Sequence, residues 1–270
     1  SEGVHKPLLT VVYNRAPNTP GVPVVDGLVS AKVADGSTKL FLGNPKPRLR
    51  VPVADPDKDS VKVQFAYFYT ATDQPVVLCE AGAVASGGTA SCTSRVAIPD
   101  NKNTWIRARS FDGRVWSGWG PGKEIRPAFI APYAPKIACP ASANKTWVER
   151  VRSAETCTLT ARHTSWSSSP TKVTWRVNGG AWQEKTFNQI SADTKAADVR
   201  VGGVPGGHQI EAYVTSPTGK KSAISTYSFG YGAPSLVTPT AAVTTHGGVK
   251  VEGVGAPAQR GLQVQGAIQW

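Results

Sequence analysis

Apolar and polar residues alternate in short runs along this chain of 270 residues. In residues 47–67, Leu49, Val51 and Val53 alternate, and after a polar turn apolar residues return at positions 61, 63, 65 and 67. A period of two places one face of a β-strand in a core and leaves the other face wet. Long stretches of Ala, Leu, Glu and Lys at helical spacing are missing, so the pattern predicts an all-β chain.

The arrangement of strand, polar loop and strand recurs in residues 157–177 and again in 247–270. Residues 103–113 and 207–219 each predict a later strand that ends in a tight polar turn. About seven short strands in roughly 100 residues are typical of a two-sheet sandwich. Further strands that complete the first two repeats are expected at 116–125 and 222–229.

Proline-rich joints at 16–20, 131–135 and 232–234 separate the repeats. Short, stiff joints predict modules that form a semi-rigid rod. The third repeat has too few strands to close a sandwich alone, so it is either truncated or paired with a neighbour. The expected domains are the closing strand of a preceding β domain (1–16), a first sandwich (17–130), a second sandwich (131–232) and the opening strands of a third (233–270).

The four cysteines fall into two local pairs, Cys79 with Cys92 and Cys139 with Cys157. Three pairings are conceivable, and these two loops are the obvious choice if each pair lies within one domain. Zinc is the competing interpretation, but no C-x2-C occurs and no histidine stands at ligand spacing. Disulfides indicate an oxidising compartment, and hence a secreted or cell-surface protein. The start Ser-Glu-Gly shows no signal peptide, which suggests a mature or excised fragment.

The net charge of +12 favours anionic partners such as wall polymers. Lysines and arginines are scattered, with no run of five or more, so nucleic acid is a disfavoured partner. No apolar run approaches the roughly 18 residues that a membrane span requires. The charge therefore indicates solubility together with a mild preference for anions.

Three stretches carry a family resemblance: PRLRVPVADPDKD (47–59), VKVQF (61–65) and IRARSFDGRVWSGW (106–119). They resemble fibronectin type III-like modules of large secreted actinobacterial proteins, in which a W/I-R-A-R strand ends in D-G and is followed by W-S-x-W. Residues 7–20 resemble the last strand and linker of a DNRLRE-type module. Such modules often precede Rhs/YD-repeat regions of polymorphic toxins or stand beside laminin-G-like domains. The resemblance implies tandem fibronectin type III/immunoglobulin-like β-sandwiches and brings no catalytic residues.

The W-S-x-W element is the most specific motif. Trp105, Arg107 and Arg109 alternate along one strand, and Trp116 and Trp119 follow it, which predicts a ladder of guanidinium groups between indole rings. The motif also resembles the WSxWS box of cytokine-receptor fibronectin modules, where the ladder is structural. A sugar-stacking platform and an aromatic–basic nucleic-acid surface are the alternatives. The residues expected to face the core are Ile106, Ala108 and Ser110.

Asp55, Asp57 and Asp59 suggest calcium, since hard cations prefer clustered carboxylates. The EF-hand pattern fails, because Ser60 and Ala66 stand at its glycine and bidentate glutamate positions. A plain turn rich in Asp and Pro is the favoured interpretation. No other cofactor is expected.

Trp147, Trp166 and Trp182 are the candidate sugar-stacking residues of the second repeat. Trp182 follows an Asn-Gly turn, which is typical of a hairpin. Trp147 and Trp166 lie in polar surroundings and are expected at the surface. Trp175 alternates with valines and is expected in the core.

The sequence contains little that indicates an active site: the four histidines are scattered, and no G-x-S-x-G, H-E-x-x-H or P-loop occurs. The chain is therefore expected not to be an enzyme. The leading hypothesis is a set of structural spacer or interaction modules of a large secreted or cell-surface bacterial protein, with the N-terminal region of an Rhs-type toxin as one setting. Its expected partners are the other domains of the same polypeptide. The alternatives are a carbohydrate- or cell-wall-binding module and the accessory domains of an extracellular hydrolase.

Overall fold

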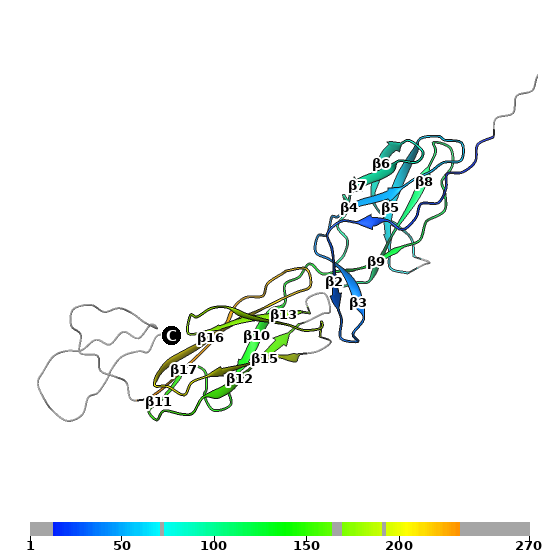
Figure 1. The fold of residues 1–270 in the computed structure, drawn as a ribbon. Helices are drawn as coiled ribbons and strands as arrows, with labels where there is room; N and C mark the ends of the chain where they lie inside the picture. The colour runs from blue at the N-terminus through cyan, green and yellow to red at the C-terminus, as the bar shows by residue number, and fades with distance from the viewer. Residues whose placement is uncertain (1–12, 71–72, 164–168, 191–192, 233–270) are drawn as a thin grey trace, which may run out of the picture. The chain divides into compact units, whose positions relative to one another are not determined.

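The computed structural model describes residues 13–70, 73–163, 169–190 and 193–232. These residues form strands, turns and loops and contain no helix, which confirms the predicted all-β class. The chain divides after Ile130 into two units (Figure 1). Of the closing strand expected at 1–16, the structure describes only residues 13–16, which form no strand, and the third repeat (233–270) lies outside the described residues.

The first unit has nine described strands in two sheets. They are β1 (Val24–Val25), β2 (Leu28–Lys32), β3 (Thr38–Leu42), β4 (Arg48–Pro52), β5 (Val61–Phe68), β6 (Val76–Val84), β7 (Thr89–Thr93), β8 (Thr104–Phe111) and β9 (Lys123–Pro127). The small sheet has the order β1-β4-β7 and the large sheet the order β2-β3-β9-β8-β5-β6. Alternating residues of both sheets, among them Leu49, Phe65 and Ile106, are fully buried and form one core.

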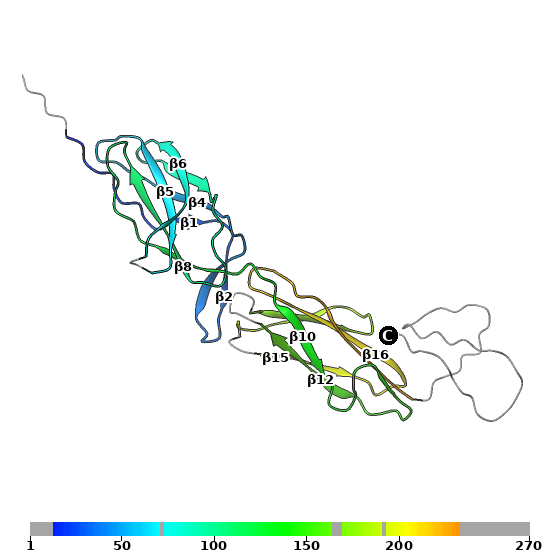
Figure 2. The same cartoon turned by 180° about the vertical axis from the view of Figure 1, so that it is seen from behind.

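The second unit repeats this plan with eight described strands (Figure 2). They are β10 (Tyr133–Ala138), β11 (Thr146–Val148), β12 (Glu155–Arg162), β13 (Lys172–Val177), β14 (Gln183–Thr186), β15 (Thr194–Val201), β16 (Gly206–Thr215) and β17 (Ser225–Tyr231). The small sheet has the order β10-β12-β15 and the large sheet β11-β17-β16-β13-β14. Leu159, Ile210 and Phe229 lie at the centre of its core.

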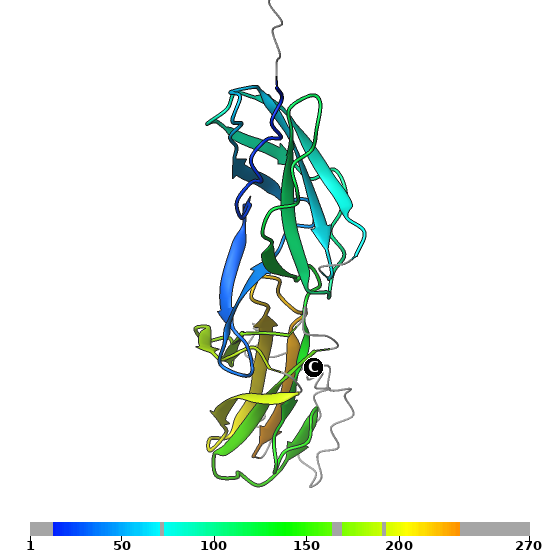
Figure 3. The same cartoon turned by 90° about the vertical axis from the view of Figure 1, so that its right-hand side faces the viewer.

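Each unit contains strands beyond the expected seven, and they come from the same place in the chain. The connection between the first two strands of the small sheet adds the β2–β3 hairpin in the first unit (Figure 3) and β11 in the second. β3 pairs in parallel with β9, and β11 pairs in parallel with β17. In both units the last strand of the sandwich thus gains a second neighbour.

Two sequence-based expectations were wrong in detail. Of the expected strand 116–125, only residues 123–125 are regular, within β9. Before them, the backbone N–H groups of Ser117 and Gly120 donate to the carbonyl groups of Ser110 and Ala108, and this unequal spacing interrupts the β-ladder. The strand expected at 222–229 likewise begins later, at Ser225.

The other wrong expectation concerns β5, for which the alternation of apolar residues predicted one buried face and one solvent-exposed face. Its burial instead becomes continuous from Val63 onward, so that Gln64 and Phe68 are buried as well. The side chains that cover this second face belong to the tryptophan–arginine ladder described next.

Candidate functional site

The turn after β8 is closed by the hydroxyl group of Ser117. The Ser110 N–H donates to Ser117 Oγ (2.9 Å), and Ser117 Oγ donates to the carbonyl oxygen of Gly118 (3.0 Å). The backbone N–H of Ser117 also donates to the Ser110 carbonyl (2.8 Å). These bonds hold Trp116 and Trp119 on the outer face of the large sheet, beside the arginines of β8.

Arg109 is the centre of the first ladder. Its guanidinium carbon lies 4.4 Å from the ring centre of Trp116 and 4.6 Å from that of Trp119. Arg109 Nε and Nη2 both donate to Gln64 Oε1, at 3.0 and 2.7 Å. Gln64 Nε2 in turn donates to Glu80 Oε1 (2.7 Å). The cation is therefore held between two rings and a hydrogen-bonded amide.

The ladder continues at both ends through residues that the sequence pattern did not indicate. Phe111 stacks on Trp116 with ring centres 4.7 Å apart, and Phe68 meets Trp119 edge to face at 5.2 Å. Arg107 lies over Phe68 at 5.0 Å. The structure thus brings together four of the five expected ladder residues. The fifth, Trp105, packs with Arg107 against Gly122, where a side chain at position 122 would crowd both residues.

The second unit closes the equivalent turn with the same device. The Val214 N–H donates to Ser222 Oγ (3.0 Å), and Ser222 Oγ donates to the Ala223 carbonyl (2.8 Å). An isolated bridge precedes each serine: Phe111 with Trp116 in the first unit, and Thr215 with Lys221 in the second. Lys221 therefore stands at the position of Trp116.

The equivalent positions of the second unit form a second ladder, in which the cation and the aromatic ring have exchanged places. Lys221 Nζ lies 5.0 Å from the ring centre of Tyr213, the residue at the position of Arg109. Tyr213 meets Trp182 edge to face at 5.4 Å, and the Arg176 guanidinium lies 4.6 Å from the Trp182 ring centre. Arg176 Nε also pairs with Glu211 Oε2 at 2.5 Å. Of this set the sequence pattern indicated only Trp182.

Both disulfides are present with the expected pairing. Cys79–Cys92 joins β6 of the large sheet to β7 of the small sheet, and Cys139–Cys157 joins the end of β10 to β12. Disulfides indicate an oxidising compartment.

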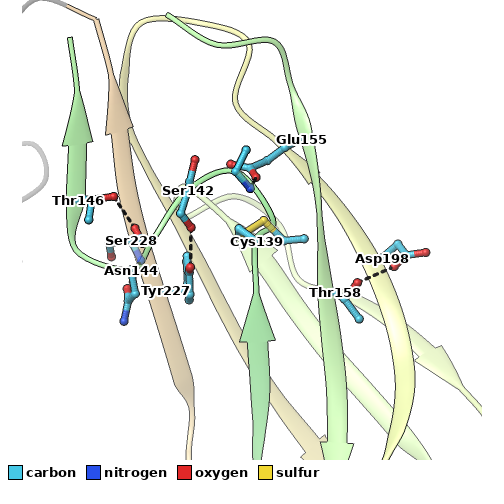
Figure 4. The surroundings of a disulfide bond; sticks show 12 residues. Cys139, Ser142, Asn144, Thr146, Glu155, Thr158, Asp198, Tyr227 and Ser228 are labelled. Carbon is cyan, nitrogen blue, oxygen red and sulfur yellow. Dashed lines mark hydrogen bonds between the residues drawn. A yellow bond between two sulfur atoms is a disulfide. The ribbon is translucent and has the colours of Figure 1, made fainter. Parts of the chain in front are cut away.

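Glu155 and Ser142 lie near the Cys139–Cys157 disulfide (Figure 4), and both belong to a hydrogen-bonded cluster. The phenol of the fully buried Tyr231 donates to Glu155 Oε1 (2.6 Å), and Ser142 Oγ lies 2.6 Å from the same phenol oxygen. The backbone N–H of Ala141 donates to Glu155 Oε2 (2.8 Å). Burial would raise the pKa of Glu155, but the hydrogen bonds from Ser142, Tyr231 and Ala141 outweigh burial and lower that pKa.

This shift predicts an acid-sensitive second unit. Because the Glu155 pKa is lower in the folded than in the unfolded chain, its contribution to stability is complete above the unfolded pKa. That contribution is lost as the pH falls through the folded pKa. In thermal melts, a Glu155→Gln variant should melt below the wild type at neutral pH, and the gap should close in acid. A gap that stays constant with pH would contradict the assignment.

Trp147, on β11, is fixed against the last strand. Its indole Nε1 donates to the Gly232 carbonyl (2.7 Å), and its ring fills the space that a side chain at Gly230 would take. The ring is half-buried rather than at the surface.

Gly230→Ala should therefore destabilise the second unit by about 1–2 kcal/mol, because the new methyl group would overlap the Trp147 ring. Gly207→Ala is the matched control, since Gly207 pairs directly with Gly230 and its side-chain space is open. Urea unfolding of both variants measures the difference. Equal stabilities would show that the ring moves aside without cost.

The three aspartates are not gathered around a cation position. Asp55 Oδ1 accepts the backbone N–H groups of Asp57 (2.7 Å) and Asp59 (3.3 Å), and Asp57 forms an ion pair with Arg15 (2.8 Å). In the part of the chain that the structure describes, no group of three potential metal ligands occurs. The geometry is that of the Asp-rich turn.

The remaining candidates are dispersed. Trp166 lies outside the described residues, and Trp175 is half-buried against the core of the second unit. His208 is buried, with Nε2 3.1 Å from the Val204 carbonyl oxygen. No helix long and apolar enough to cross a membrane is found over the described ranges.

No protein-family model and no curated protein matches this chain. Among solved structures, it is similar to the fibronectin(III)-like modules of CbhA from Clostridium thermocellum, with 16% identity, a TM-score of 0.35, and coverage of 82% of this chain and 99% of that one. It is also similar to the FN1–FN3 domains of chicken CNTN1, with 11% identity, a TM-score of 0.32, and coverage of 80% and 69%. By its own sheet order, the chain is a tandem of fibronectin type III/immunoglobulin-like β-sandwiches.

Proposed function

We propose that the two sandwiches are non-catalytic spacer and interaction modules of a larger secreted or cell-surface protein. The observation that carries this proposal is the first ladder. Its polar and aromatic side chains make their hydrogen bonds and ring contacts with one another. Arg109 is enclosed by Trp116, Trp119 and Gln64, so its donors and both rings serve to fix the sheet. Groups engaged in this way stabilise a module rather than act on a substrate.

Two further features support a spacer. The disulfides fix each sandwich separately, one within each unit. The short connection between β9 and β10 contains Pro132, which restricts the backbone between the units. The resemblance of residues 47–119 to modules of secreted actinobacterial proteins supports such a parent, and the N-terminal region of an Rhs-type toxin is the setting we propose.

A distance measurement between the units tests the spacer role. Because all four cysteines are in disulfides, spin labels at Arg114→Cys and Val204→Cys, both exposed, would report on the joint alone. A narrow distance distribution, unchanged by salt, is expected. The label pair Arg114→Cys and Thr93→Cys lies within the first unit. It gives the width of the distance distribution that is expected when the two labelled sites do not move relative to each other. A much broader distribution between the units would refute a stiff spacer.

A further inference from the structure

The second ladder differs from the first in how much of its indole reaches solvent. Trp182 is 41% exposed, whereas every other tryptophan of the described ranges is half-buried. Trp116 and Trp119 are half-buried, with Arg109 against both rings. The second unit therefore presents an indole ring where the first encloses its rings.

The exposed ring is held in one orientation. Arg176 covers it, and Arg176 is itself fixed by its ion pair with Glu211, while Tyr213 supports the ring from the side. A ring ordered before binding loses little side-chain entropy when a ligand arrives.

The hairpin that carries Trp182 is also well defined. Asn178 and Gly179 have φ values of 50° and 69°, as a type I′ turn requires, and the Gly180 N–H donates to the Val177 carbonyl (2.9 Å). Asn178 Oδ1 accepts the backbone N–H of Gln209 (2.8 Å), which ties the turn to β16. The ring therefore stands on a rigid support.

Of the positively charged side chains described around Trp182, one has no carboxylate partner and is available to an anionic ligand. Lys172 pairs with Glu184 (3.1 Å), and Arg176 pairs with Glu211. Lys221 is exposed and lies over the Tyr213 ring, and it forms no ion pair with any described carboxylate. A carboxylate beside Lys221 would gain a charge-assisted contact without displacing a protein partner.

We propose that Trp182, Tyr213, Arg176 and Lys221, the Trp182 surface, bind an anionic polysaccharide. A pyranose ring presents a face of C–H bonds, whose partial positive charge suits the negative face of the indole. A uronate carboxylate farther along the glycan would reach Lys221. A nucleic acid strand would need a track of cations along its backbone, whereas among the described residues around Trp182 only Lys221 is a cation without a carboxylate partner. The inference goes beyond the spacer role, because a spacer need not bind any glycan.

Affinity electrophoresis of the full chain in gels containing polygalacturonate, at about 0.05 M and about 0.5 M NaCl, tests the proposal. Trp182→Ala should weaken retention about tenfold at both salt concentrations, since stacking is insensitive to screening. Lys221→Gln should weaken it at low salt only. Trp119→Ala, in the enclosed ladder of the first unit, should bind as the wild type does.

Three outcomes would overturn the proposal. Retention of Trp182→Ala equal to that of the wild type would show that the ring is not used. Retention that vanishes at high salt in every variant would reduce the interaction to general charge attraction. Stronger retention by single-stranded DNA than by polygalacturonate would assign the surface to nucleic acid. None of these outcomes bears on the distance measurement that tests the spacer.

Discussion

Replacing Cys139 and Cys157 together with alanine is expected to lower the free energy of unfolding of the second unit by about 3 kcal/mol. The bond closes a loop between residues 18 positions apart, and that loop carries β11 and the Ser142 end of the Glu155 cluster. Without the bond, the unfolded chain regains the entropy of the open loop. Hydrogen exchange under increasing urea, read separately for peptides of each unit, measures the loss.

The other disulfide provides the control. The double variant Cys79→Ala/Cys92→Ala should weaken the first unit and leave exchange in the second unchanged, because each bond lies within one unit. Loss of protection in both units from either variant would mean that the sandwiches do not unfold independently.

The second large effect is expected from Arg109→Ala, which should destabilise the first unit by about 2–3 kcal/mol. The change removes two cation–ring contacts and leaves the carbonyl of the buried Gln64 without its donors. Phe68 would also gain solvent contact if Trp119 became mobile. Urea unfolding followed by tryptophan fluorescence measures the change, and the Trp116 and Trp119 emission should shift to the red before unfolding begins.

Two variants separate the ladder from simple charge loss. Arg109→Lys keeps the cation but loses the planar fork that reaches Gln64, so its stability should fall between those of alanine and arginine. Arg48→Ala removes an exposed arginine from the small sheet and should have little effect. If the alanine variants of Arg109 and Arg48 unfold at the same urea concentration, the ladder is not stabilising.

The sequence predicted the strands that bury one face against the core. Residues 47–67 and 103–113 contain β4 and β8, in which burial of alternate residues imposes a period of two, and all of β5 except Phe68. The added strands were not predictable in this way. Residues of β2 are half-buried or exposed throughout, so no alternation marks them, and β11 has only three residues, all half-buried. Their strand form depends on pairing with neighbours far along the chain.

The ladders show a second limit of sequence patterns. The contribution of β8 was predictable from W-x-R-x-R, but that of β5 was not, since Gln64 and Phe68 occupy positions that alternation assigns to solvent. The ladder of the second unit was hidden because cation and ring exchange places. The shared serine hydrogen bonds of Ser117 and Ser222, together with the β-bridge before each serine, reveal that Lys221 corresponds to Trp116.

The parallel pairings of β9 and β17 have a consequence for how such modules are assembled during synthesis. Because β9 lies between β8 and β3, and β17 between β16 and β11, the last strand to leave the ribosome in each sandwich enters a slot with a partner on both sides. The parallel pairing covers Arg126–Pro127 of β9 and Phe229–Tyr231 of β17, so part of the edge that would otherwise be open to a similar neighbour is already occupied. Tandem modules are prone to swap strands as they fold, and we expect this added pairing to disfavour such exchange.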